Sequence, residues 1–438
     1  MKETIIRDPI HGYIDLSHYP FIKKIIETPY FQRLRRLSQL GVSVYVYPSA
    51  VHNRFNHSLG AMQLFTRVYD HLFRDVREFD KEKFDKLRKI GVATVLLHDI
   101  GHGPFSHVSE SMFGFKHESL SQRIISEEMK NILKDDGISH DDVRTVIDTT
   151  KRSQIGELRI LSQLVDSAID VDRLDYLARD IYFTGVGFGI IDLDRIIHTM
   201  TIHREIGTFL DERMVIEEKG KRSIETLLLT RDVMYSDVYY HKATRGIEGL
   251  LRSLFKRVKN ISEEGKMELP SELQFLNDDR KFSFSDLFDL DDNFIYSLLL
   301  KWSKDAKDKI VSDLSRRIVN RDLFKAIEYP IGGNIIKIAK SEDEIKKMLQ
   351  KNEIDPEYYY FIDEPEDRPY SPVLSITNPE EQQKALEKNI FIRLENSKCN
   401  EISQESRIIK TLTERQYFTR LYVPAELRES SRKILQNQ

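Results

Sequence analysis

Two histidines and two aspartates, in the order His…His-Asp…Asp, are the residues of this chain with the clearest chemical meaning. His57 lies in HNRFNHSLG (52–60), His98-Asp99 in LLHDIGHGPFSH (96–107) and Asp172 in IDVDRLDYLARD (169–180). Imidazole suits Mn, Fe, Co, Ni or Zn, whereas carboxylates suit harder cations such as Mg. A mixed set can hold one divalent ion and leave positions for water and phosphate. The four residues therefore predict a metal centre at which water becomes a nucleophile.

The elements around the His98-Asp99 pair must bring both side chains to one ion. Neighbours on a regular helix point about 100° apart, so the pair is expected near a helix end. The preceding IGVATVLL (90–97) is apolar almost all round, which predicts a buried helix. Gly101 and Gly103-Pro104 would end it, because glycine permits left-handed geometry and proline cannot continue a helix.

Any one of these histidines alone would be interpreted as a core or capping residue. Four ligand-type residues together, with His102 and His107 following the His-Asp pair, favour the metal centre instead.

Length and composition describe a protein with a large core. At 438 residues, one large domain with an appended lobe is expected. The net charge of −4 gives no overall attraction to nucleic acid. Cys399 is the one cysteine, so there is no intrachain disulfide framework, which fits a reducing cytoplasm. MKETIIRDPI lacks the apolar run of a signal peptide, and no stretch approaches a membrane span, so we expect a cytoplasmic protein without a membrane partner.

Periodicity predicts mainly helix, with short hairpins before and after the metal-binding region. Hairpins are predicted in ETIIRDPIHGYIDL (3–16), turning near His11-Gly12, and in 196–218 around Gly207. Helices are expected from about 19 to 182, over 222–260, and on to about 328.

The composition shifts after Tyr329-Pro330. IIKIAK (335–340), YYYFIDE (358–364) and VLSIT (373–377) are interpreted as strands separated by Gly and Pro. We therefore predict a helical domain over 1–330 and a smaller mixed α/β lobe over 331–438.

Six ordered blocks resemble HD-domain phosphohydrolases, and more closely the deoxynucleoside triphosphate triphosphohydrolases typified by the catalytic core of the SAM- and HD-domain protein. A bare His-Asp pair would be weak evidence, whereas the ordered set is specific. The blocks are DPIHG (8–12), TPYFQRLRRLSQLG (28–41), YPSAVHNRFNHSLG (47–60), LLHDIGHGPFSH (96–107), IDVDRLDYLARD (169–180) and YYHKATRG (239–246). Similarity thins beyond about residue 250, where FIDEPEDRPYSP (361–372) and RQYFTRLYVP (415–424) still match.

The resemblance implies a mainly α fold with an HD-domain helical core. It also implies hydrolysis of a deoxynucleoside triphosphate to deoxynucleoside and inorganic triphosphate, with a divalent ion in the protein and additional Mg on the triphosphate.

A sugar-binding set is implied around Asp172. Asp172, Tyr176 and Asp180 follow an i, i+4, i+8 pattern and would line one stripe of a helix. Their plainer interpretation is a helix-start acid, a core tyrosine and a surface salt bridge. By resemblance, Tyr176 packs under the deoxyribose and disfavours a 2′-hydroxyl, while Asp180 binds the 3′-hydroxyl. Gln39 matches a further 3′-hydroxyl contact, and Leu40 is its apolar neighbour.

Phosphate and base contacts are implied as well. Arg54, Arg173 and Arg231 match positions that hold the triphosphate, with Arg173 replacing a lysine of the relatives. Arginine keeps its charge and offers a planar fork of donors, so we expect binding to be preserved with altered geometry. Tyr239 matches a ring beside the nucleobase.

Three histidines and a glutamate match the family's supporting and proton-transfer positions: His102, His107, His117 and Glu118. His107 is the first choice for the proton donor to the departing 5′-oxygen, and Arg54 would act with this catalytic set. His117 and Glu118 would form an acid relay, since a carboxylate favours the charged imidazole. The remaining histidines are interpreted as structural or surface residues: His11, His18, His52, His71, His140, His198 and His203.

Relatives of this type form tetramers with effector nucleotides bound between subunits, so the resemblance implies a homotetramer. Polar or basic groups remain at several effector positions, namely Gln32, Arg35, Arg195, Lys219, His241 and Lys242. Glu27 replaces an aspartate, while Thr4, Arg7 and Glu217 replace a lysine, an asparagine and an arginine. Losing cations should weaken such a site or change its preference.

Two other functions remain open at this point. One is a phosphohydrolase with another nucleotide or phosphoester substrate. The other is a nucleotide-sensing or single-stranded nucleic-acid-binding module, which could dispense with the metal.

Overall fold

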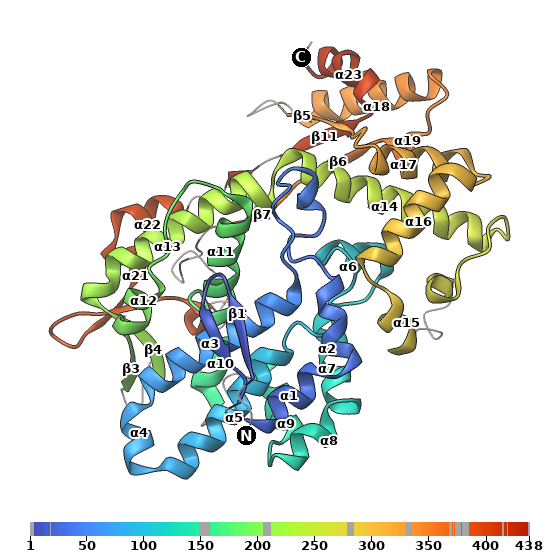
Figure 1. Cartoon of the computed structure of the whole chain (residues 1–438). Coiled ribbons are helices and arrows are strands. Elements are labelled where there is room, and N and C mark those ends of the chain that lie inside the picture. Colours follow the sequence, from blue (N-terminus) through green and yellow to red (C-terminus); the bar gives the residue numbers. More distant parts are fainter. Residues whose placement is uncertain are drawn as a thin grey trace.

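The computed structural model describes residues 4–17, 19–148, 158–204, 212–277, 284–329, 335–367, 370, 372, 378, 385–413, 416–417 and 419–436. Helices make up most of this part of the chain, and the strands are short and lie in small sheets (Figure 1). The predicted mainly α fold is confirmed. Among these residues we find no helix with the length and apolar character that crossing a bilayer requires.

The predicted N-terminal hairpin is present. Its two strands pair antiparallel, and Gly12 at the turn has φ of +75°, which favours glycine. Asp8 holds the turn, because its Oδ1 accepts the backbone N–H groups of Ile10 and His11 at 2.9 and 3.0 Å. The elements here are β1 (Ile5–Asp8), β2 (Gly12–Asp15), α1 (Pro20–Ile26) and α2 (Pro29–Arg33).

Three helices form the scaffold of the predicted metal centre: α3 (Arg54–Leu72), α5 (Lys81–Leu97) and α11 (Val171–Thr184). Helix α3 packs against both others. Glycines permit the close approach, because a Cβ on Gly91 would lie 2.0 Å from the Phe65 ring and one on Gly60 2.1 Å from Asp175 and Arg179. Residues 90–97 are all buried, so the predicted buried helix is confirmed.

Helices dominate the described residues between 20 and 184, as predicted. The others in this part are α4 (Arg74–Phe79), α6 (His107–Phe113), α7 (His117–Glu127), α8 (Lys130–Asp135), α9 (His140–Ile147) and α10 (Arg159–Val165).

The second hairpin forms, but it begins later than predicted. Residues 196–199 belong to α12 (Leu193–Thr199), whose start is capped by Asp192, since Oδ1 accepts the N–H of Arg195 at 2.9 Å. The strands are β3 (Met200–Arg204) and β4 (Glu212–Glu217). Gly207 lies outside the described residues.

The predicted helix over 222–260 is interrupted. It consists of α13 (Lys221–Met234), a π-helical turn at Tyr235–Tyr239, and α14 (Lys242–Glu263). Such turns often lie at functional sites. Here the turn brings the Tyr239 hydroxyl to Asp180, to which it donates at 2.7 Å.

Helices continue through α15 (Phe284–Asp289), α16 (Asp292–Asp305) and α17 (Lys309–Val319). The prediction of helix to about 328 is wrong at its end, where β5 (Lys325–Glu328) pairs antiparallel with β11 (Arg420–Val423). A partner strand almost one hundred residues away cannot be read from local periodicity, and tertiary pairing decides here.

The strand predicted at IIKIAK is also wrong, because these residues begin α18 (Ile335–Lys351). Ser341, Ile345 and Leu349 recur at every fourth position and are buried, which is the face of a helix. YYYFIDE is divided between α19 (Pro356–Tyr359) and β6 (Phe361–Asp363), and VLSIT lies outside the described residues.

The C-terminal part is mixed α/β and returns to two places on the helical body. Strand β8 (Phe391–Arg393) pairs parallel with β4 in a sheet of order β3-β4-β8-β9, in which β9 is Cys399–Glu401, and β11 lies between β5 and β6. Helix α22 (Arg407–Leu412) contacts α13, whereas α18 and α23 (Arg428–Gln436) lie together near the C-terminus (Figure 1). The predicted boundary near 330 stays a prediction. The remaining elements are β7 (Glu366–Asp367), α21 (Ile402–Glu405) and β10 (Gln416–Tyr417).

Two large apolar cores meet beside the predicted site. The first surrounds α3, α5 and α11 and includes Phe65, Leu96 and Leu174. The second surrounds α14 and includes Leu250, together with Phe105 from the segment that follows the His-Asp pair. The site is therefore supported on both sides by packed apolar side chains.

Candidate active site

The four predicted metal ligands lie together, although they come from three separate elements. His57 projects from α3, His98 and Asp99 from the turn that follows α5, and Asp172 from the first turn of α11. Nε2 of His57 lies 2.9 Å from Oδ1 of Asp172, and Nε2 of His98 lies 3.6 Å from the same oxygen. Nε2 of His98 is also 3.4 Å from Oδ1 of Asp99. His57, His98 and Asp99 have donor atoms within 4.8 Å of one another, and Asp172 adjoins this group through both histidines.

Helix α5 ends next to His98-Asp99, as predicted, but the glycines that follow do not adopt the predicted left-handed conformation. Neither Gly101 nor Gly103 is among the described residues with positive φ. A Cβ on Gly101 would lie 2.4 Å from the His117 carbonyl oxygen, so this glycine permits close packing against α7. The positive φ values fall on Phe105 and Ser106, at 55° and 59°. Strained backbone of this kind is often found at functional sites.

Both histidines present a ring nitrogen suited to an ion. Nδ1 of His57 lies 2.8 Å from Oδ2 of Asp175, and Nδ1 of His98 lies 2.6 Å from the Val95 carbonyl oxygen. These acceptors place the ring proton on Nδ1 and leave the Nε2 lone pair free. Both Nε2 atoms are buried without a hydrogen-bond partner. Two imidazoles and two carboxylates fit Mn, Fe, Co, Ni or Zn.

The charges of the cluster also favour a cation. Burial lowers the pKa of His57, but the carboxylates of Asp172 and Asp175 outweigh it and raise that pKa to about 10. Burial raises the pKa of Asp172, but His57 and His98 hold it well below its usual range. The Asp172 carboxylate therefore stays ionised. A metal ion would take the place of a proton between this carboxylate and the imidazoles.

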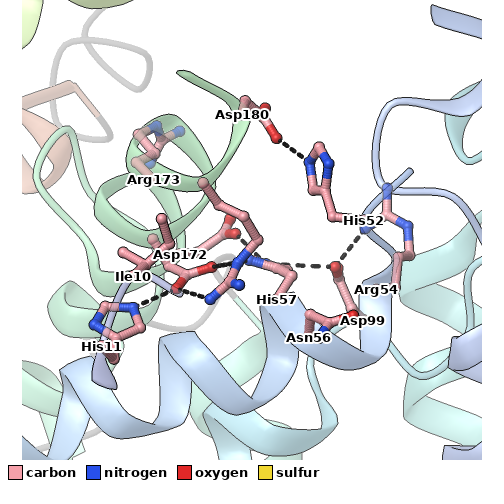
Figure 2. Close-up of polar contacts among 12 residues, drawn as sticks. Ile10, His11, His52, Arg54, Asn56, His57, Asp99, Asp172, Arg173 and Asp180 are labelled. Carbon is pink, nitrogen blue, oxygen red and sulfur yellow. Dashed lines mark hydrogen bonds and ion pairs between the residues drawn. The ribbon is translucent and has the colours of Figure 1, made fainter. Parts of the chain in front are cut away.

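A buried network holds His57 in position (Figure 2). Asp175 lies 2.6 Å from Nε2 of His11 and accepts from Nη2 of Arg179 at 2.8 Å. Arg179 also donates to Asp8 in the N-terminal hairpin at 2.7 Å. His11 is among the histidines predicted to be structural or on the surface, and Asp175 and Arg179 are not among the predicted site residues. Their i, i+4 spacing and the DPIHG block were the available signals.

We expect Asp175→Asn to bind metal about 10–100-fold more weakly, because His57 loses the charged acceptor that orients it. It should also be destabilised by about 1–3 kcal/mol, since buried Arg179 loses one of its two carboxylate partners and keeps Asp8. Titration with Mn²⁺ and urea unfolding measure the two effects, with Asp141→Asn on the surface of α9 as the control. Unchanged metal affinity would contradict this role.

The same carboxylate sets a pH dependence. Burial raises the pKa of Asp175, but Arg179, His11 and His57 hold it well below its usual range. Its contribution to stability is therefore complete above the ordinary carboxylate pKa of about 3.9 and is lost as the pH falls from there through the lowered pKa. The difference in stability between wild type and Asp175→Asn should shrink in that acidic range.

Asp99 is joined to the predicted catalytic residues. It contacts Nη1 of Arg54, and its Oδ1 lies 3.2 Å from Nε2 of His102. Nε of Arg54 donates to the Ser106 hydroxyl at 3.0 Å. Burial and the neighbouring Arg54 lower the pKa of His102 well below its usual range, so its ring is neutral and can donate to Asp99.

Glu110 lies in the candidate site but is not among the residues predicted from the sequence. Its Oε1 contacts Nδ1 of His117 and lies 3.6 Å from Nδ1 of His107. Glu118 is also 3.6 Å from Nδ1 of His117, but its side chain is 62% exposed. The acid relay of His117 with Glu118 stays a prediction, and Glu110 is the more closely placed carboxylate. The spacing of His107 and Glu110 on one helix face was the available signal.

A cavity of about 470 Å³ lies beside these residues. Two partners orient Asp180 at its wall: Nε2 of His52 lies 2.7 Å from Oδ1, and the Tyr239 hydroxyl donates to Oδ2 at 2.7 Å. The predicted site residues that line the cavity are Gln39, Leu40, Arg54, His107, Tyr176, Asp180 and Tyr239.

The two other predicted phosphate ligands are not part of this lining. The guanidinium of Arg173 contacts the Asp170 carboxylate and the Ser167 carbonyl oxygen. The guanidinium of Arg231 lies 5.1 Å from the centre of the Tyr235 ring. Their contact with a triphosphate stays a prediction, and for Arg173 it requires release from Asp170.

The predicted effector residues make local contacts in the single chain. Nε of Arg35 donates to Gln32 at 2.9 Å, and Nη2 of Arg195 donates to the Lys219 carbonyl oxygen at 3.1 Å. Glu27 lies 3.7 Å from Lys23. Nδ1 of His241 accepts the N–H of Ala243 at 3.2 Å, at the start of α14 where Lys242 follows. Their binding of an effector stays a prediction.

Comparison with known proteins gives a consistent result. Residues 54–180 match the HD domain, and residues 191–437 match the HD associated region. The uncharacterized protein YwfO of Bacillus subtilis is 33% identical, over 97% of this chain and 93% of its own length. A crystal structure of a phosphohydrolase from Bacteroides thetaiotaomicron has a TM-score of 0.78 and 31% identity, and covers 96% of this chain and 100% of its own.

A further relative has a named activity. The deoxynucleoside triphosphate triphosphohydrolase SAMHD1 homolog of Dictyostelium discoideum is 28% identical over 75% of this chain and 60% of its own length. The SAMHD1 of Xenopus laevis is 29% identical over 74% of this chain and 55% of its own length. The HD domain match begins at Arg54 and ends at Asp180, so it spans the four predicted metal ligands and much of the cavity wall. This chain belongs to the HD-domain phosphohydrolases that carry an HD associated region.

Proposed function

We propose that this protein is a metal-dependent deoxynucleoside triphosphate triphosphohydrolase. One observation supports the proposal: Gln39, Tyr176 and Asp180, predicted to bind the sugar, line the same cavity as Arg54 and His107, and Arg54 contacts the predicted metal ligand Asp99. Relatives named deoxynucleoside triphosphate triphosphohydrolase, at 28–31% identity, support the same reaction.

The reaction breaks the bond between the α-phosphorus and the 5′-oxygen. Water adds to phosphorus, the 5′-oxygen takes a proton, and deoxynucleoside and inorganic triphosphate are released. A divalent ion held by His57, His98, Asp99 and Asp172 would supply the activation of water and neutralise charge on the phosphoryl group.

The protein's own groups complete this chemistry. Arg54 is fixed by Asp99 and Ser106, so its charge is already oriented toward a phosphoryl group. His107 lines the cavity, where its ring can donate a proton to the leaving oxygen, and its Nδ1 lies 3.6 Å from Oε1 of Glu110. His52 and Tyr239 hold Asp180 where it can accept the 3′-hydroxyl.

A product assay tests the proposal. The protein is incubated with each deoxynucleoside triphosphate, singly and in pairs, with Mg, Mn, Fe or Co, and the products are separated chromatographically. Release of deoxynucleoside with inorganic triphosphate is the expected result, and higher rates in a pair would indicate nucleotide activation. Release of orthophosphate or pyrophosphate would contradict this reaction and support a phosphohydrolase that cleaves another bond.

We also propose a homotetramer that is strengthened by deoxynucleotide. Its support is the resemblance at Gln32, Arg35, Arg195, Lys219 and His241, which come from distant parts of the chain and include several cations on a net acidic protein. A ligand that binds only the assembled state stabilises it by mass action. Light scattering over a dilution series should show a tetramer that resists dilution better with deoxynucleotide. A monomer that is fully active at all concentrations would overturn both statements.

A further inference from the structure

A second group of potential metal donors lies next to the HD centre. His102, His107, Glu110 and His117 come from the start of α6, the start of α7 and the segment before them, and each has a donor atom within 4.8 Å of the others. Only His102 of this group contacts the four ligands described above, through Asp99. The group is therefore a separate set of donors.

Ring geometry shows which histidines can share an ion. The rings of His102 and His117 are stacked, with centroids 3.8 Å apart and planes at 14°. The lone pairs of nearly parallel stacked rings run side by side, so both rings cannot easily bind one ion. The His107 ring is inclined by 72° to that of His117, which lets their lone pairs converge. His117 is the member of the stacked pair whose Nδ1 contacts Glu110, so the two rings that can share an ion with this carboxylate are His107 and His117.

Glu110 supplies a third donor between the two rings. Its Oε1 lies 3.6 Å from Nδ1 of His107 and contacts Nδ1 of His117. In a tetrahedral zinc site with bonds of 2.0–2.1 Å, neighbouring donors are about 3.3 Å apart. The separation of Glu110 from His107 is close to this value, and Glu110 lies nearer still to His117, so an ion could be bound if the side chains of Glu110 and His117 moved apart.

The backbone explains why these donors meet. His107 and Glu110 are three residues apart in α6 and share a face of the helix. Gly114 ends α6 with φ of +80°, a left-handed conformation that favours glycine. The chain then reverses, and α7 begins at His117, beside Glu110.

The group is open to solvent on one side. The side chain of His107 is 74% exposed, and those of Glu110 and His117 are 28% and 15% exposed. Two imidazoles, one carboxylate and an open position are typical of zinc sites that keep a water.

We propose that His107, Glu110 and His117 form a second metal site, suited to Zn²⁺, whose occupation inhibits the enzyme. The ion takes the place of the proton that Glu110 and His117 share, and this proton is released to solvent. The inhibitory effect rests on the proposed function, because the ion would engage the imidazole assigned to protonate the leaving oxygen. The metal site itself does not depend on that assignment.

A metal count tests the site without any activity measurement. Wild-type protein loaded with its HD-centre metal is dialysed against buffered free Zn²⁺, and all metals are counted per chain. We expect two ions in the wild type and one in His107→Ala and in Glu110→Gln. Asp172→Ala should lose the ion of the HD centre and keep the ion of the second site. His140→Ala removes an imidazole on α9 outside the group and should still bind two.

The same experiment can overturn the proposal. A count of one ion per chain in the wild type at saturating Zn²⁺ would show that the second site does not exist. A count of two ions in both His107→Ala and Glu110→Gln would show that these residues do not form it. His107 is exposed, so its replacement should leave the fold intact, and thermal unfolding checks this. Zn²⁺ should inhibit wild-type turnover over the concentration range in which the second ion binds. Binding of two ions with unchanged turnover would overturn the inhibitory role and leave the site standing. A protein that has no turnover before Zn²⁺ is added, but still binds the second ion when Zn²⁺ is supplied, would count against the proposed function alone.

Discussion

Asp172→Ala is expected to lose both its HD-centre metal and its turnover. Asp172 approaches both histidines through one oxygen, since its Oδ1 lies 2.9 Å from Nε2 of His57 and 3.6 Å from Nε2 of His98. Without it, two imidazoles and Asp99 remain, and Asp99 is already engaged by Arg54 and His102. We expect turnover to fall by a factor on the order of 10³ or more, because the activated water is lost with the ion. Metal analysis and product release measure the two effects.

The fold of this variant should survive. The Asp172 side chain is 34% exposed, and its removal relieves the crowding of carboxylates in the cluster. Asp141→Ala on the surface of α9 is the matched control and should keep metal and turnover. A folded Asp172→Ala protein that retains one HD-centre ion per chain would show that this assignment is wrong.

The fold was predicted best where local patterns and final structure agree. The buried helix at 90–97 could be recognised because every position is apolar or small. The strand expected at IIKIAK failed because six residues are too few to separate an apolar strand from a helix. The longer window includes Ser341, Ile345 and Leu349 at helical spacing and would have corrected it.

The candidate ligands were predictable because the family motifs lie in short ordered blocks. The residues that position them were harder to predict, because their contacts join distant parts of the chain. Asp175 meets His11 across 164 residues, and Arg179 meets Asp8 across 171. A single sequence does not identify the distant residue that pairs with a buried carboxylate. The structure adds that His52, interpreted as structural, orients Asp180.

Gly101 shows that the role of a residue cannot always be predicted from its type. Gly101 was interpreted as a left-handed helix end, whereas its role is to let the turn approach the His117 carbonyl. Both roles require glycine, so the residue type alone could not separate them. The distinction matters for function, because close packing of this turn on α7 brings His117 beside His102, with ring centroids 3.8 Å apart.

Tyr176→Ala is expected to relax the choice between deoxyribonucleotides and ribonucleotides. Tyr176 lines the cavity one helical turn before Asp180, and its ring lies edge-on to Tyr239 with centroids 6.3 Å apart. A sugar whose 3′-hydroxyl is bound by Asp180 would rest against this ring, which leaves no room for a 2′-hydroxyl. Steric exclusion of one small group changes specificity by about 10–100-fold, so the ratio of kcat/KM for dATP over ATP should fall by that factor.

Tyr176→Phe separates the ring from its hydroxyl. It keeps the aromatic surface against the sugar, so it should retain the wild-type preference if the ring itself excludes the 2′-hydroxyl. Both variants should keep the HD-centre metal, because Tyr176 is not one of its ligands, and metal analysis checks that the site is intact. Comparable turnover of ATP and dATP by the wild type would contradict the whole sugar assignment. If Tyr176→Ala kept the wild-type preference for dATP over ATP, the Tyr176 ring would have no role in excluding the 2′-hydroxyl. Another part of the cavity would then be responsible.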